Sequence, residues 1–155
     1  MKGKVNTNEE MWPFGKKNDR DKKDAKQFAK DYKELMGRIT VSLKAVDTVM
    51  EAAPQLEMLE GLASYGMPQA VTFLGLALLM DDKPWYDPVK GLETMKRAAE
   101  MDDAQSAFSK LELGRVYLIG RKDIPVDPVS GRYWVEQSAA LGYLPALEEI
   151  QSRWD

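Results

Sequence analysis

The 155-residue chain contains no cysteine and no histidine. Without cysteine there are no disulfides, no thiol nucleophiles and no thiolate metal ligands. Without histidine the chain lacks the most frequent general base and the commonest transition-metal ligand. Only carboxylate, Lys, Tyr, Ser or Thr side chains remain for chemistry, so we expect no cofactor and no metal site.

Long apolar segments are also missing. The most apolar run, Val71 to Met80, has about half of the roughly 20 residues that a membrane span needs. The N-terminal Met1-Lys2-Gly3-Lys4 continues into Asn and Glu, without the apolar stretch of a secretory signal. We therefore expect a cytoplasmic protein.

Charge is spread unevenly along the chain, whose net charge is −3. Residues 1–38 hold 11 Lys and Arg against 7 Asp and Glu, whereas residues 39–155 hold 11 against 18. The basic head could contact nucleic acid or anionic lipid, but its own acids dilute that field, so a solvated helix face is favoured. We expect no nucleic-acid partner, and the acidic body would suit a basic protein.

The N-terminal part is predicted to hold a flexible segment, 1–21, and an amphipathic helix, 22–56. In the first, Trp12 and Phe14 form an apolar island beside lysines, which we expect to dock on the body; insertion into a membrane surface is the alternative. In the second, apolar residues recur at steps of three and four from Asp24 to Met50, on one helical face. These residues are Phe28, Tyr32, Leu35, Ile39, Leu43, Val46 and Met50.

Pro54 interrupts this pattern, and short apolar segments separated by breaks follow it. The breaks lie at 66–68, 81–87, 102–103, 120–127 and 142–145. No segment alternates apolar and polar residues between hairpin turns, so we predict no strands. The pattern indicates an all-α array of antiparallel helices over residues 57–155.

An internal repeat runs through this array. Leu74-Gly75 recurs as Leu113-Gly114 after 39 residues, and Asp87-Pro88 recurs as Asp127-Pro128 after 40. Asp before Pro is typical of a helix N-cap followed by the first helical position. Glycines at 75, 91, 114 and 131 let helix backbones approach closely, and Gly66 and Gly142 suit helix ends where the chain reverses. Two helices per unit predict a short α-solenoid of antiparallel helix pairs, with the N-terminal helix as its cap.

The second copy of this internal repeat resembles the Sel-one-like repeat, a relative of the tetratricopeptide repeat. Its residues 113–120 fit the first helix of that family, Leu-Gly-x-x-Tyr-x-x-Gly, and 124–127 resemble the Val-Pro-x-Asp linker. Gly131, Trp134, Ser138-Ala139 and Gly142 fall at its second-helix positions. The preceding unit is more diverged, with Leu78 in place of the Tyr and Thr94 in place of the Trp. The resemblance covers about residues 58–154 and implies adaptor roles.

The resemblance also implies a concave face lined by the first helix of each pair. The residues placed there as partner-binding are Leu76, Leu79, Phe108, Leu111, Arg115 and Leu118. Leucines and a phenylalanine around one arginine are typical of protein-binding patches. The alternative is that the N-terminal helix itself fills this groove. We expect Trp134, Tyr117 and Leu113 to be core residues.

A second candidate surface is Trp85-Tyr86, in a linker that the helical pattern leaves exposed. The loop acids lack the spacing of a calcium loop, so we interpret them as caps and solvated residues. We therefore predict a non-catalytic protein–protein interaction module: an adaptor, or a bacterial regulator that neutralises its partner as immunity proteins do. The alternatives are an enzyme using carboxylates and a scaffold attached to a membrane surface.

Overall fold

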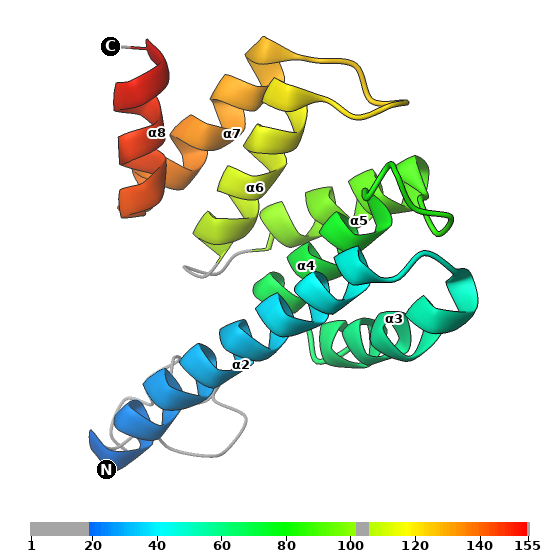
Figure 1. Ribbon diagram of the computed structural model, residues 1–155. Helices are drawn as coiled ribbons and strands as arrows, with labels where there is room; N and C mark the ends of the chain where they lie inside the picture. The colour runs from blue at the N-terminus through cyan, green and yellow to red at the C-terminus, as the bar shows by residue number, and fades with distance from the viewer. Residues whose placement is uncertain (1–18, 102–105, 155) are drawn as a thin grey trace. The chain divides into compact units, whose positions relative to one another are not determined.

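The computed structural model describes residues 19–101 and 106–154, and every regular element in this part is an α-helix (Figure 1). The helices are α2 (Asp19–Ala45), α3 (Val49–Ala63), α4 (Pro68–Leu78), α5 (Pro88–Ala99), α6 (Ser106–Ile119), α7 (Pro128–Ala140) and α8 (Leu144–Trp154). One isolated bridge pairs Arg121 with Ile124 inside a loop. The all-α prediction is confirmed for the described residues. Trp12 and Phe14 lie outside them.

The chain divides into two compact units, residues 1–37 and 38–155. Helix α2 crosses this division, and the predicted border between residues 56 and 57 falls inside α3. The second unit contains every predicted partner-binding residue, and the description below concerns that unit.

The predicted helix from Asp24 to Met50 is wrong at its C-terminal end. Helix α2 stops at Ala45, and Thr48 caps a new helix by accepting a hydrogen bond of 3.1 Å from the amide of Glu51. Met50 therefore lies in the first turn of α3, where it is exposed rather than on the apolar face of α2.

Pro54 lies inside α3, so it does not interrupt the helical structure as predicted. A proline within a helix removes the hydrogen bond to the carbonyl four residues earlier, here that of Met50. Both Pro54 and Met50 are exposed, so water can reach that carbonyl. The cost of the missing bond is thereby reduced, and the helix continues to Ala63.

The other described breaks fall where the sequence predicts them. Gly66 and Gly142 have positive φ angles of 75° and 81° and follow the ends of α3 and α7. Gly120, after α6, has a φ of 77°. Only glycine adopts this conformation without strain, which explains why the chain reverses at these points.

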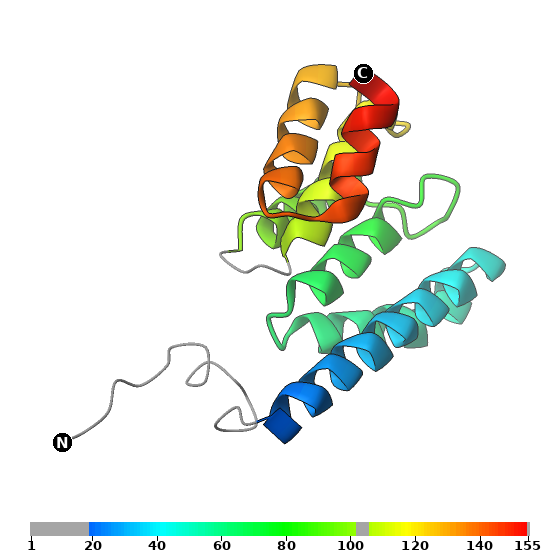
Figure 2. The same ribbon diagram turned by 90° about the vertical axis from the view of Figure 1, so that its left-hand side faces the viewer.

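The helices of the second unit pack mainly against their neighbours in the sequence. Helix α4 packs on α5 and α6 packs on α7, and contacts of α5 and α4 with α6 join the two pairs (Figure 1). Helix α3 packs on α4 at one end, and α8 lies alongside α7 at the other (Figure 2). We call α4–α5 the first hairpin and α6–α7 the second hairpin.

The glycines of the two hairpins make equivalent contacts. A Cβ atom on Gly75 would lie 3.1 Å from the Gly91 carbonyl oxygen, and one on Gly114 would lie 2.9 Å from that of Gly131. A Cβ atom on Gly91 would lie 2.7 Å from the Leu79 side chain, and one on Gly131 would lie 2.6 Å from that of Leu118. These glycines therefore set the close crossing of the two helices in each hairpin, as predicted.

The second helix of each hairpin starts in the same way. The carboxylate of Asp87 accepts a hydrogen bond of 3.0 Å from the Lys90 amide, and that of Asp127 accepts one of 3.1 Å from the Ser130 amide. The backbone amides of both aspartates donate over 2.8 Å to the preceding helix, at Leu78 and Tyr117 respectively. The predicted caps are confirmed, and the two capped helices begin 40 residues apart.

Two clusters of buried residues in the described part of the chain contribute to the core of the hairpins. The larger joins both hairpins and contains Leu79, Met95, Ala99, Leu113, Val116 and Ile124. The smaller joins the second hairpin to α8 and contains Leu111, Val135 and Ala146. Trp134 and Tyr117 are partly buried against the larger cluster, so they have the packing role predicted for them without being fully enclosed.

Candidate functional site

Two residues of the predicted concave face are core residues. Leu79 retains 1% of its accessible surface and Leu111 retains 2%. Leu79 belongs to the larger cluster and lies against Gly91, whereas Leu111 belongs to the smaller cluster beside Val135. Their placement on an open face is therefore wrong: the tight crossing within each hairpin and the contact with α8 enclose them.

Three other apolar residues of the predicted face are half-buried. Leu118 lies against Gly131 inside the second hairpin, in the position that Leu79 has in the first. Leu76 packs on the larger cluster, and Phe108 has its ring centroid 5.5 Å from that of Phe73. The contacts of these side chains are mainly within the unit, so they offer only part of their surface to a partner.

Arg115 is engaged by two carboxylates. Its Nη1 donates over 2.8 Å to Glu112 on its own helix, and its Nε donates over 3.0 Å to Glu149 on α8. Arg153 contributes a further contact of 3.4 Å to Glu149. Burial alone would raise the pKa of Glu149, but the hydrogen bond and charge of Arg115, with those of Arg153, lower it overall. The predicted cation of the patch therefore fixes α8 to α6.

The predicted exposure of Trp85 is wrong. Trp85 retains 7% of its accessible surface, and its indole N–H donates over 3.1 Å to the carbonyl of Ala77. Tyr86 is partly buried against the larger cluster, and its hydroxyl accepts a hydrogen bond of 3.2 Å from the Asp123 amide. The pair closes the loop of the first hairpin instead of standing free.

Several cations not singled out by the sequence serve as helix C-caps. Lys83 donates to the carbonyls of Lys44 and Val46 at the end of α2, over 2.9 and 2.7 Å. Arg121 donates over 3.2 Å to the carbonyl of Leu79 after α4, and Lys110 donates over 2.6 Å to that of Ala99 at the end of α5. The positive charges offset the partial negative charge of each helix end. No sequence signal reveals contacts between residues this far apart in the chain.

A hollow that the sequence did not predict lies on the outer side of α5. It has a volume of about 370 Å³ and lies between α5 and the loop 120–127 of the second hairpin. Leu92 and the buried Ile124 supply apolar surface, and Glu93 and Asp123 are exposed carboxylates on its lining. The complete lining is Pro88, Val89, Leu92, Glu93, Lys96, Asp123 and Ile124. We call this the α5 hollow.

Three carboxylates of the described loops accept hydrogen bonds from backbone amides. Asp87 and Asp127 are caps, and Asp81 accepts a hydrogen bond of 3.1 Å from the Lys122 amide. Hydrogen bonds from the Ser130 hydroxyl and amide lower the pKa of Asp127. Within residues 19–101 and 106–154, no group of three or more Asp or Glu side chains is arranged to hold a metal ion. Asp102 and Asp103 lie outside this part.

No helix in the described ranges is both long enough and apolar enough to cross a membrane. Comparison with protein-family models, with curated proteins and with solved structures found no match to this chain. The resemblance to the Sel-one-like repeat therefore depends on the residues of the sequence alone.

Proposed function

We propose that the chain is a non-catalytic protein-binding module, built as a short α-solenoid similar to the Sel-one-like repeat. The observation that carries this proposal is the repetition of one helical hairpin, with equivalent glycine contacts and equivalent aspartate caps, in α4–α5 and α6–α7. Stacked helical repeats form extended surfaces that proteins use mainly for binding.

The polar groups of the second unit support a binding role over a catalytic one. A general acid at neutral pH needs a carboxyl group whose pKa is raised by its surroundings. The pKa values of Glu149 and Asp127 are instead lowered, by an ion pair and by capping hydrogen bonds respectively. Both carboxylates are thus adapted to remain charged and to hold the helices in place.

The charge of the body favours a basic partner. Residues 39–155 carry 18 Asp and Glu against 11 Lys and Arg. Ion pairs such as Arg115 with Glu149 and Lys83 with Asp47 remove one charge of each sign, so they leave this acidic excess unchanged. An acidic surface accelerates the association with a basic protein and makes it sensitive to salt. The partner would be regulated or neutralised by the module, or joined by it to another protein.

Affinity capture followed by reconstitution tests this proposal. The full chain is immobilised and exposed to lysate of the cells that produce it, and retained proteins are identified by mass spectrometry. A Leu113→Asp variant is the control, because a carboxylate at this fully buried position unfolds the hairpins. We expect a basic protein that is retained by the native chain, released by high salt and bound directly when both proteins are purified.

Failure of every retained protein to bind in purified form would overturn the proposal. Turnover of a small molecule by the purified chain that is lost on Glu149→Gln would also overturn it, because it would identify a carboxylate enzyme.

A further inference from the structure

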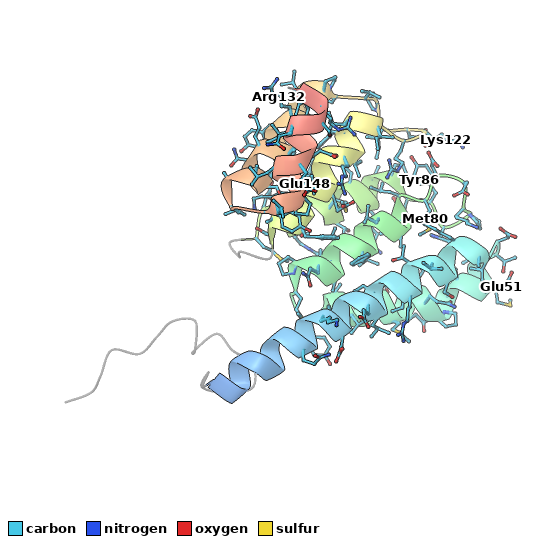
Figure 3. The ribbon with its side chains drawn as sticks, turned by 60° about the vertical axis from the view of Figure 1, so that its left-hand side comes forward. Glu51, Met80, Tyr86, Lys122, Arg132 and Glu148 are labelled. Atoms are coloured by element: carbon cyan, nitrogen blue, oxygen red, sulfur yellow. The ribbon has the colours of Figure 1, made fainter. Side chains whose placement is uncertain are left out.

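Hydrogen bonds within the chain fix the wall of the α5 hollow. Its outer wall is the loop 120–127, which three hydrogen bonds fix to the first hairpin. The Lys122 amide donates to Asp81, the Asp123 amide donates to Tyr86, and the Arg121 side chain donates to the Leu79 carbonyl. Figure 3 shows Tyr86 and Lys122 at the same end of the unit. A preformed surface binds at lower entropic cost than one that must be ordered.

The lining of the hollow combines apolar residues with two carboxylates and one cation. Leu92 and Ile124 form its apolar centre, together with the exposed side chain of Val89. The charged residues of the lining are Glu93, Asp123 and Lys96, all exposed, so carboxylates exceed cations by one. The site would therefore favour a ligand that carries both an apolar group and positive charge.

The size and openness of the hollow favour a protein segment over a small molecule. Small-molecule sites bury most of the surface of their ligand. Four of the seven lining residues of the α5 hollow are exposed, so the hollow is too shallow to enclose a ligand in this way. A protein segment needs to bury only one anchoring side chain here, while its backbone and neighbouring residues lie over the rim.

We propose that the α5 hollow binds a basic segment of the partner protein. One large apolar side chain of that segment lies between Leu92 and Ile124, and flanking Lys or Arg residues face Glu93 and Asp123. This inference deepens the proposed function, since it assigns the binding surface and the chemistry of the partner. It places binding on the outer side of α5, the second helix of the first hairpin. The residues that the sequence predicted belong instead to the first helix of each hairpin, α4 or α6, or lie beside it.

A matched pair of valines makes the site testable. Val89 lines the hollow on α5, whereas Val129 is the equivalent residue of α7, 40 positions later, and is not part of the lining. Both are second residues of their helices and both are exposed, at 69% and 81%. Arginine at either position is expected to leave the fold intact, so Val89→Arg and Val129→Arg differ mainly in their distance from the hollow.

The experiment titrates the full chain with an amidated Lys-Arg-Leu-Arg-Lys peptide and follows amide chemical shifts by NMR. We expect saturable shifts around Leu92 and Ile124. Val89→Arg should weaken binding about tenfold, because it repels the cations and fills the hollow, while Val129→Arg should not. A peptide with Ser in place of Leu tests the apolar anchor, and one with Glu in place of the cations tests the charge; both should bind at least about tenfold more weakly.

Any of four results would overturn the inference. Absence of saturable shifts, or equal weakening by Val89→Arg and Val129→Arg, would show that the hollow is no specific site. Equal binding of the Glu-containing peptide would exclude a basic ligand. Concentration-dependent dimers that Val89→Arg abolishes would identify a second copy of the chain as the occupant. In each case the partner capture above still decides the proposed function independently.

Discussion

Helices α5 and α7 have equivalent places in the two hairpins but different outer surfaces. Inside the hairpins, equivalent residues make equivalent contacts. Gly91 lies against Leu79 in the first hairpin, and Gly131 lies against Leu118 in the second. On the outside, Leu92 of α5 lies in the hollow, whereas the equivalent Arg132 of α7 bonds to Glu136 and lies 5.2 Å from the ring of Trp154.

This difference indicates at which positions the two hairpins can carry different residues. Helix crossings and caps constrain the residues between the helices, so substitutions there change the packing of the whole unit. The outer face carries no such constraint and can differ between hairpins. Helix α8 supplies a contact to the outer part of α7 through Trp154, while the same part of α5 borders the hollow.

The largest expected effect concerns the two tryptophans. Trp85→Ala should destabilise the second unit by roughly 3–5 kcal/mol, because it removes a buried ring and leaves the Ala77 carbonyl without its indole donor. Trp134→Ala should cost less, since Trp134 is only partly buried. Urea denaturation of both variants measures the difference, and a smaller loss for Trp85→Ala would contradict its position in the structure.

The next effect compares the two helix crossings. Alanine at Gly114 would place Cβ within 3.1 Å of two backbone atoms of α7, whereas the closest contacts at Gly75 are to the flexible side chain of Met95. Gly114→Ala should therefore cost roughly 1–3 kcal/mol despite its better helix propensity. Gly75→Ala should cost clearly less. Thermal and denaturant melts of the two variants check this order; equal costs would mean that the crossings respond alike to added volume.

A smaller effect is expected at the C-cap of α2. Lys83→Met keeps the aliphatic stem but removes both hydrogen bonds to the carbonyls of Lys44 and Val46. Water can reach these exposed and half-exposed residues, so the loss should be about 1 kcal/mol, at the low end for an unsatisfied group. Hydrogen exchange should become faster at the C-terminal end of α2 and stay unchanged in α7. Faster exchange in α7 as well would indicate global unfolding instead of a lost cap.

The smallest effect is a pH dependence at α8. The pKa of Glu149 is lowered in the folded chain, so its contribution to stability is present above its unfolded pKa and is lost as pH falls through the folded one. Glu149→Gln should lower the melting temperature at neutral pH. The melting temperatures at neutral and acidic pH should therefore differ less in this variant than in the native chain. An unchanged pH dependence in Glu149→Gln would show that other carboxylates account for the acid sensitivity.

The sequence predicted those features that depend on neighbouring residues. Asp before Pro at 87 and 127 gave the caps, and Gly66 and Gly142 gave the reversals, because each works within a few residues of its own position. The break between α2 and α3 was missed, since Thr48 is a cap without a proline or glycine beside it.

The candidate site was harder to predict because it depends on contacts between distant residues. Leucines at 79 and 111 have the same local pattern as exposed ones, and only the helix crossings bury them. Arg115 has no sequence neighbour that reveals its bond to Glu149, 34 residues away. The α5 hollow likewise combines Leu92 with Ile124, from two different hairpins.

The most direct test of the account is a calorimetric titration of the purified chain with the protein that it captures. We predict saturable binding that weakens with salt, is reduced by Val89→Arg and is unchanged by Val129→Arg. A captured protein that gives no saturable heat with the native chain would contradict the central claim that the repeated hairpins form a protein-binding module.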